Sequence, residues 1–260
     1  MRIAITRPVS SSLAGCELSF VSRTAIDVER AQAQHRDYCR ALAATGCSVI
    51  QLPAEPDMPD AVFVEDTAIV LDELAVMTRP GAVSRRGEGA TVAPVLSGFR
   101  TLRAIDAPGT LDGGDVLRIG RRVFVGQAAR SNPDALAQLR ALLAPHGYTV
   151  QGVDTHECLH LKSAVTLVAD GTVLLQPEWV DAAVFSDYRV IPVDPDEPHA
   201  ANAVRIEGSV IYPTSFPRTQ ARLEAAGVQV LAVDISELQK AEGAVTCCSI
   251  LFHDRTKESR

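Results

Sequence analysis

The sequence has no stretch in which lysine and arginine are concentrated, although 25 of its 260 residues are one or the other. The 32 acidic residues outnumber these cations, and the formal net charge is −7. Because phosphate binding requires a basic surface, we expect no nucleic-acid partner. A run of about 18 apolar residues is also missing, so we expect no transmembrane helix. The first seven residues lack the apolar core of a secretory signal, and we expect no association with a membrane.

Motifs for nucleotides and for catalytic metals are missing as well. The sequence contains no G-x-G-x-x-G, no P-loop and no H-E-x-x-H. A zinc site built on His160 and Cys247 would have too few evident ligands, so we expect neither a metal nor another cofactor. The six cysteines show no regular framework, and a chain of this length does not need disulfides. We therefore expect reduced thiols and a cytoplasmic location.

The sequence does contain an internal repeat. With 47% apolar residues the chain can bury a large core, and we expect one catalytic domain over residues 1–260. Short polar segments precede apolar strands at intervals of 49, 45, 42 and 45 residues. These segments are marked by Asp66, Asp115, His160, Asn202 and Cys247.

Each of the first four units is predicted to begin with a strand hairpin, because turn residues separate two apolar runs. The predicted hairpins are Thr67–Leu71 with Leu74–Thr78, Val116–Ile119 with Arg122–Val125, Ala164–Val168 with Thr172–Leu175, and Ala203–Ile206 with Ser209–Tyr212. Helical periodicity follows at Asn132–His146 and Phe216–Ala226, and closing strands are predicted at Tyr148–Val153, Tyr188–Val193 and Val228–Val233.

The fifth unit is split between the two ends of the chain. Its first strand, Val245–Phe252, can be completed only by N-terminal segments: the strand Arg2–Thr6, the helix Val28–Ala44 and the strand Ser48–Leu52. Five strand–strand–helix–strand units predict a closed radial array, an α/β propeller of five blades whose N- and C-terminal segments share one blade. The polar segments would then meet at one end of the axis. An ordinary α/β domain with strands about 45 residues apart is the alternative.

A nucleophile, an acid–base group and an orienting acid lie at matching points of this repeat. Cys247 and His160 begin two of the units, and Asp112 lies just before a third. Thiol, imidazole and carboxylate are the groups that nucleophilic catalysis combines. Cys247 and His160 also have ordinary structural explanations, as a small buried apolar residue and as a hydrogen-bonded core residue respectively. Their shared position in the repeat favours the catalytic interpretation.

Cys247 and Cys248 are adjacent in the strand predicted for the fifth unit. Successive side chains of an extended strand point to opposite faces, so only one of the two thiols can face the pocket. Alternation alone does not determine which.

Three acids, Asp60, Glu65 and Asp66, surround a second apolar run. A solvated loop would explain them, but unpaired carboxylates between apolar segments are costly, and a cationic ligand would reduce that cost. A guanidinium matches the geometry of carboxylates well. Arg85 and Arg130 are candidates for binding an anion, with an ordinary surface position as the alternative for each.

With these residues identified, the chain resembles the dimethylarginine dimethylaminohydrolases, of the guanidine-modifying pentein superfamily with five-bladed α/β propeller folds. The resemblance extends over essentially the full length. Around Leu13 the segment Val9–Cys16 keeps the leucine but otherwise departs from the family. The ordered motifs that carry the resemblance are Ile26–Ala31, Gln34–His35, Val62–Asp66, Thr78–Ala82, Ser84–Arg86, Thr110–Asp115, Leu159–Ser163, Ala200–Asn202 and Thr246–Ser249.

The resemblance implies a role for each candidate residue. Cys247 is the nucleophile, His160 is the proton donor, and Asp112 is the acid beside that histidine. The residues that it places around the substrate are Glu65 and Asp66 at the guanidinium, Arg85 and Arg130 at the α-carboxylate, and Asp60 with the backbone carbonyls of Leu13 and Ala241 at the α-amino group.

The implied reaction is hydrolysis of dimethylarginine or monomethylarginine to citrulline and a methylamine through a covalent thiouronium on cysteine. The substrate is a small molecule and no metal takes part, although Zn²⁺ could inhibit by binding Cys247 and His160; a homo-oligomer is compatible. One alternative is an arginine deiminase-like hydrolase of unmethylated guanidines, a branch that usually carries an inserted helical subdomain for which this chain has no room. Another is a non-catalytic propeller that binds a partner, which would not need the complete set of catalytic residues.

Overall fold

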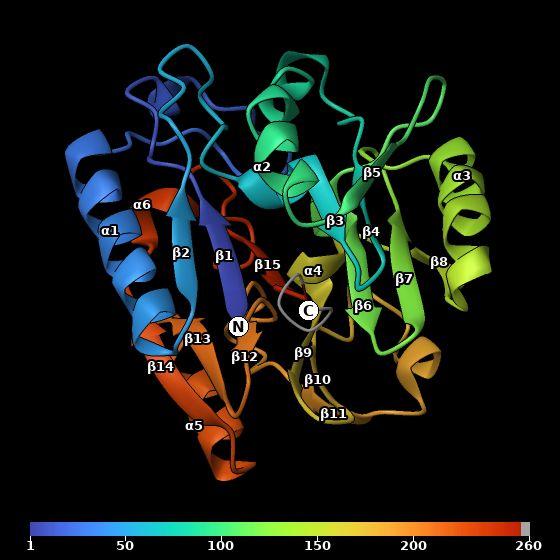
Figure 1. Cartoon of the computed structure of the whole chain (residues 1–260). Helices are drawn as coiled ribbons and strands as arrows, with labels where there is room; N and C mark the ends of the chain where they lie inside the picture. Colours follow the sequence, from blue (N-terminus) through green and yellow to red (C-terminus); the bar gives the residue numbers. More distant parts are fainter. Residues whose placement is uncertain (256–260) are drawn as a thin grey trace.

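Five three-stranded sheets surround one axis in the computed structural model, which describes residues 1–255 (Figure 1). In each sheet the middle strand is antiparallel to one neighbour and parallel to the other. The first four blades are β3 (Ala68–Val70), β4 (Leu74–Met77) and β5 (Thr101–Ala104); β6 (Val116–Ile119), β7 (Arg122–Gln127) and β8 (Thr149–Asp154); β9 (Val165–Ala169), β10 (Thr172–Leu175) and β11 (Arg189–Pro192); and β12 (Val204–Ile206), β13 (Ser209–Pro213) and β14 (Gln229–Val233).

The fifth blade joins the two ends of the described chain. Strand β1 (Arg2–Thr6) lies between β15 (Ile250–His253) and β2 (Ser48–Gln51), antiparallel to the former and parallel to the latter. This arrangement closes the ring and confirms the predicted five-bladed α/β propeller with a split blade.

Two details of the blades differ from the prediction. The last strand begins at Ile250 and not at Val245, because residues 245–248 form a turn. Cys247 and Cys248 therefore lie outside any strand, and the argument from strand alternation does not apply to them. The first blade also ends with β5, which was not predicted; its side chains are mostly exposed, so the segment lacks the apolar pattern of a buried strand.

Four helices lie on the outside of the ring (Figure 1): α1 (Val28–Ala44), α2 (Ala93–Ser97), α3 (Pro133–Leu143) and α5 (Pro217–Ala225). The longer ones begin at N-caps that accept backbone hydrogen bonds, Asp27 for α1 and Asn132 for α3. The shorter helical elements are α4 (Leu161–Ala164), α6 (Ser236–Gln239) and the 3-10 turns Leu13–Gly15, Val64–Thr67, Val83–Arg85, Glu88–Ala90, Gly113–Asp115, Ala144–His146 and Ala182–Phe185. Within the described residues, no helix has the length and apolar character that crossing a bilayer requires.

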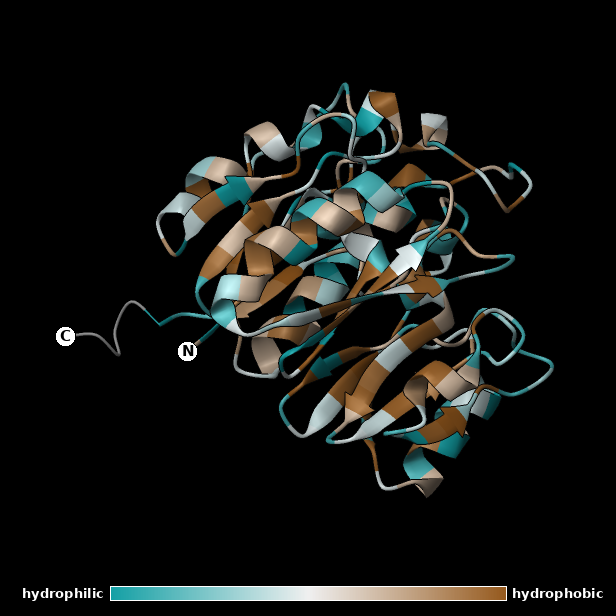
Figure 2. Cartoon of the chain, turned by 90° about the vertical axis from the view of Figure 1, so that its right-hand side faces the viewer, coloured by the Kyte–Doolittle hydropathy of each residue, from teal (hydrophilic) through white to brown (hydrophobic). Residues whose placement is uncertain are grey.

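The apolar core is divided among the blades and their covering helices. Apolar residues gather on the strands, whereas many connecting loops are polar (Figure 2). Helix α1 buries Ala31, His35, Tyr38 and Leu42 at helical spacing, and it packs against β2 of the fifth blade and β14 of the fourth. The apolar residues thus pack between the blades and the outer helices, and polar residues lie at the ends of the axis.

Candidate active site

The polar segments that begin the blades form short helical turns at one end of the axis. Asp66 lies in the turn before β3, Asp115 ends the turn before β6, and His160 caps α4 before β9. Cys247 lies in the turn at residues 245–248 before β15. Asp66, His160 and Cys247 lie around one small cavity, whose lining is Glu17, Asp60, Phe63, Asp66, Arg85, Arg130, Leu159, His160, Ala241, Glu242 and Cys247.

His160 is buried and pairs with Asp112. Its Nε2 atom lies 3.0 Å from Oδ2 of Asp112, whose other oxygen accepts a hydrogen bond of 2.8 Å from the Gly81 amide. Burial lowers the pKa of the imidazole, but the surrounding carboxylates, Asp66 foremost, outweigh burial and raise the pKa to about 9. The imidazole is therefore protonated at neutral pH and can donate a proton. Asp112 supports it from behind and is not part of the cavity lining.

Gly114 is required by the close approach of His160. A Cβ atom there would lie 2.6 Å from Nδ1 of His160 and 2.9 Å from Oδ1 of Asp66. The absence of a side chain also lets the Gly114 amide donate to Asp66 at 2.8 Å. The motif Thr110–Asp115 thus uses its second glycine for packing, not for flexible backbone.

Cys247 faces the cavity, and Cys248 does not. Cys248 is fully buried, and its thiol lies 3.5 Å from the carbonyl oxygen of Ala244. Burial, together with the carboxylates of Glu65 and Asp66, raises the pKa of the Cys247 thiol to about 12. The raised pKa keeps this thiol neutral at neutral pH, and a bound cation would favour the thiolate by offsetting those carboxylates.

Asp66 and Arg85 form a buried ion pair beside the cavity. Nη1 of Arg85 lies 2.7 Å from Oδ2 of Asp66, and the same guanidinium binds both oxygens of Glu88 at 3.0 and 2.8 Å. Burial raises the pKa of Asp66, but the charges of His160 and Arg85 outweigh this and lower it to about 2. Glu88 was missed from the sequence, although its position three residues after Arg85 in a helical turn is typical of an ion pair.

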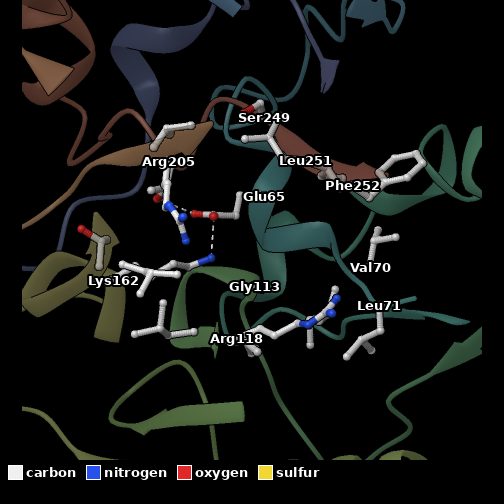
Figure 3. A pocket seen from close by; sticks show the side chains of 18 of the residues that line it. Glu65, Val70, Leu71, Gly113, Arg118, Lys162, Arg205, Ser249, Leu251 and Phe252 are labelled. Carbon is white, nitrogen blue, oxygen red and sulfur yellow. Dashed lines mark hydrogen bonds and ion pairs between the residues drawn. The ribbon is translucent and has the colours of Figure 1, made fainter. Parts of the chain in front are cut away.

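Glu65 faces the other end of the axis, where the strands enclose a central cavity of about 460 Å³ (Figure 3). Its carboxylate binds Nζ of Lys162 at 2.5 Å and accepts a hydrogen bond of 2.7 Å from Thr246. Of the two acids predicted to contact the guanidinium, Asp66 therefore faces the active-site cavity and Glu65 does not. Lys162 was missed, although it lies within the motif Leu159–Ser163.

Leu13 lies outside the lining of the active-site cavity. Its side chain is fully buried in the core, and its carbonyl oxygen accepts a hydrogen bond of 3.0 Å from the Cys16 amide. The structure thus brings seven of the predicted residues to the cavity, places Asp112 behind His160, and leaves Glu65 and Leu13 apart. The seven are Asp60, Asp66, Arg85, Arg130, His160, Ala241 and Cys247.

A metal ion would have to compete with existing contacts. Among the described residues, the ligand atoms of Asp66, Asp112 and His160 lie within 4.8 Å of one another. These atoms already take part in the Asp112–His160 pair and the Asp66–Arg85 pair. The expected lack of a metal cofactor remains a prediction.

Residues 17–21, here called the lid segment, are hydrogen-bonded to three residues of the cavity lining, and Glu17 itself lines the cavity. The amide of Glu17 donates to Asp60 at 3.1 Å, and Nη2 of Arg130 donates to Ser19 Oγ at 3.1 Å. The carboxylate of Glu242 accepts hydrogen bonds from the amides of Ser19, Phe20 and Val21. The cavity volume of about 20 Å³ has room for about one water molecule and is far too small for an amino acid, so the lid segment must move before a substrate enters.

Replacing Glu242 by alanine is expected to free the lid segment, because three backbone amides lose their shared acceptor. Trypsin should cleave after the exposed Arg23 at least about threefold faster, since proteolysis follows the population of the open form. Glu242→Gln keeps one acceptor oxygen and should give an intermediate rate. Glu224→Ala, on the distant helix α5, is the matched control. Equal cleavage rates in all four proteins would show that Glu242 does not hold the lid segment.

Five blades with polar side chains gathered at one end of their axis define a propeller of the pentein class. The chain belongs to the N,N-dimethylarginine dimethylhydrolase family, because the eukaryotic model of that family matches residues 19–253. It is 38% identical over 254 residues to the N(G),N(G)-dimethylarginine dimethylaminohydrolase of Streptomyces coelicolor, covering 96% of this chain and 97% of that protein. The corresponding protein of Pseudomonas aeruginosa is 35% identical over 228 residues, covering 87% of this chain and 90% of the relative.

Solved structures agree with this assignment. A variant of the Pseudomonas aeruginosa enzyme, with serine in place of a cysteine and in complex with citrulline, has a TM-score of 0.89 and 32% identity over 96% of this chain and 98% of that chain. A dimethylarginine dimethylaminohydrolase adduct with S-methyl-L-thiocitrulline, in which glycine replaces a histidine, has a TM-score of 0.93 and 33% identity over 97% of this chain and 100% of that chain. The predicted family resemblance is confirmed, and the chain is a hydrolase.

Proposed function

We propose that this chain hydrolyses dimethylarginine and monomethylarginine to citrulline and a methylamine through a covalent intermediate on Cys247. The observation that carries the proposal is the convergence of Cys247, His160 and Asp66 on one buried cavity. The identity of 35–38% with two named dimethylarginine dimethylaminohydrolases, over most of each chain, supports the same substrate.

Charge in the cavity explains how a neutral thiol becomes a nucleophile. A guanidinium is a poor electrophile because its charge is delocalised, so much of the rate must come from holding it beside the sulfur. Of the two acids predicted to hold the guanidinium, Asp66 is the one in the cavity lining and can pair with it. The bound cation offsets the carboxylates that raise the pKa of Cys247, and the thiol releases its proton to solvent as the substrate binds, because His160 is already protonated.

His160 then serves both halves of the reaction. Attack of the thiolate on the guanidinium carbon gives a tetrahedral adduct, and the imidazolium donates its proton to the departing amine. A thiouronium on Cys247 remains. The neutral imidazole next takes a proton from water, whose attack releases citrulline and restores both groups. Asp112 holds the ring in place throughout.

The α-amino and α-carboxylate groups of the substrate are assigned to the outer residues of the cavity. We assign Asp60 and the backbone carbonyl of Ala241 to accept hydrogen bonds from the amino group, and Arg130 to bind the carboxylate. Arg85 is shared between Asp66 and Glu88, so we assign it to holding Asp66 as well as to the carboxylate. Leu13 can contribute its carbonyl only if its turn opens with the lid segment.

Arg130→Ala is expected to raise KM for methylarginine, because a charge-assisted hydrogen bond to the carboxylate is lost. The loss of binding free energy should be about 1.5–3 kcal/mol. The penalty should be much smaller for the decarboxylated analogue, which cannot make that contact. Asp66→Asn should instead lower kcat for both compounds, because it disturbs the reacting carbon. Steady-state kinetics on the two substrates provides the comparison within one protein. If Arg130→Ala carried equal penalties on both, Arg130 would not belong to the site.

The choice between methylated and unmethylated guanidines is tested by comparing kcat/KM for dimethylarginine and arginine in the same preparation. We expect dimethylarginine to be strongly preferred. A preference for arginine would favour the deiminase-like alternative, and binding without turnover of either compound would favour a binding module. A cyanobacterial arginine dihydrolase domain shares the fold, with a TM-score of 0.88, but at 21% identity it carries no argument about substrate.

A further inference from the structure

A second buried carboxylate lies behind the active site and outside the cavity lining. Asp115 is fully buried at the end of the 3-10 turn before β6. One of its oxygens accepts a hydrogen bond of 2.5 Å from the hydroxyl of Ser131, and the other accepts one of 3.0 Å from the amide of Leu161. Leu161 directly follows His160, so this carboxylate holds the backbone that carries the imidazole.

Ser131 extends the contact to the partner of His160. Its hydroxyl oxygen accepts a hydrogen bond of 3.2 Å from the amide of Asp112. The hydrogen bonds therefore run from Asp112 through Ser131 and Asp115 to Leu161. The two ends of this path are the backbone segments that bear the two members of the His160–Asp112 pair.

The surrounding packing leaves little free space around this path. A Cβ atom at Gly126 in β7 would lie 2.5 Å from Oδ1 of Asp115 and 3.0 Å from Cβ of Leu161. Ser131 is fixed from its other side, because Asn132 exchanges two hydrogen bonds of 3.0 Å with the backbone of Thr110. The turn that ends at Asp115, the turn that begins at Leu161 and the start of α3 are thus joined at one buried point.

The charge of Asp115 acts on His160 as well. Burial outweighs the effect of His160 and the hydrogen bonds and raises the pKa of Asp115 to about 6, so the group is largely ionised at neutral pH. The carboxylates that raise the pKa of the imidazole are Asp66, Asp112 and Asp115. The other charged or titratable groups at the cavity are Glu17, Asp60, Arg85, Arg130, Glu242 and Cys247. A residue that only held backbone could be asparagine, which avoids burying a charge.

We propose that Ser131 and Asp115 are positioning residues that hold Asp112 against His160 and keep the imidazole charged between turnovers. Neither touches the substrate cavity. The proposal rests on the role given to His160 in the proposed function. We call this pair of residues the Ser131–Asp115 brace.

The first test is Asp115→Asn, which keeps an acceptor for the Leu161 amide but removes the charge. Titration of the imidazole, followed by NMR on protein with isotope-labelled histidine and assigned through His160→Gly, should show the pKa of His160 falling by about one unit. The limb of the kcat profile that reports this group should move in the same direction. An unchanged titration of His160 would overturn the electrostatic part of the proposal.

The second test is Ser131→Ala, which keeps the Asp115 side chain and breaks the path. We expect kcat to fall about tenfold while KM stays within about twofold, since substrate contacts are untouched. Ser131→Thr keeps the hydroxyl and should recover most of the rate. Tyr212→Phe, which removes a buried hydrogen bond to Ala200 in another blade, controls for general loss of stability. The positioning role would be wrong if Ser131→Ala lost no more kcat than Tyr212→Phe. It would also be wrong if Ser131→Thr failed to recover the rate.

The two tests separate failure of the brace from failure of the proposed function. The NMR titration needs no turnover, so it decides the electrostatic claim even if methylarginines are not substrates. If Asp115→Asn does not fold, the Ser131 variants decide the positioning claim alone. The wild type could lack activity on methylarginines while Asp115→Asn still lowers the pKa of His160 as predicted. That result would overturn the proposed function and leave the electrostatic effect standing.

Discussion

Cys247→Ser is expected to lower turnover of methylarginine by at least about a thousandfold while the protein stays folded. A serine hydroxyl has an ordinary pKa far above that of a thiol and cannot become an anion when a guanidinium binds. Serine also fits the space that Cys247 fills, so little change in stability is expected. Steady-state rates of citrulline formation, with thermal unfolding of both proteins as a control, measure the effect.

Cys248→Ser is the matched control for this result. Its side chain is fully buried against the Ala244 carbonyl and lies outside the cavity lining, so activity should fall by no more than a few fold. Mass spectrometry after inactivation by a guanidine- or amidine-based reagent should locate the adduct on Cys247. An adduct on Cys248, or loss of activity in Cys248→Ser alone, would reverse the assignment.

His160→Gly is expected to lower the steady-state rate by about two to four orders of magnitude, the usual contribution of general acid–base catalysis. Both halves of the reaction should slow, because one imidazole first donates a proton to the amine and later accepts one from water. In the intact protein the raised pKa keeps His160 protonated at neutral pH, as the first half requires.

The pKa of His160 also predicts how activity changes with pH. Activity that depends on the imidazolium should be retained at neutral pH and decline as pH rises through about 9 in the wild type. The rate of His160→Gly should lack that dependence. Near-normal turnover of the variant across the neutral range would show that another group moves the protons.

The repeat could be read from the sequence because its signals are local. Hairpin turns and apolar strand pairs recur at steps of 42 to 49 residues, and the helix over residues 28–44 has the predicted bounds. The strand β5 could not be found in this way, because exposed residues carry little pattern. The start of β15 was misplaced because the apolar run Val245–Phe252 includes a turn whose residues are buried by tertiary contacts.

The direction of individual side chains in the site could not be read from the sequence. Glu65 and Asp66 are adjacent, yet one carboxylate meets Lys162 in the central cavity and the other meets Arg85 at the active-site cavity. These partners come from other segments, 97 and 19 residues away, and they decide which carboxylate faces the active-site cavity. Asp115 marked the start of a blade, but its link to Ser131 and Leu161 depends on how three segments pack.

The most direct test of the central claim is the identity of the amine released from asymmetric dimethylarginine by the purified protein. We predict dimethylamine and citrulline in equal amounts, and neither from Cys247→Ser at the same concentration. Release of ammonia in place of dimethylamine, or equal product from Cys247→Ser, would contradict the account.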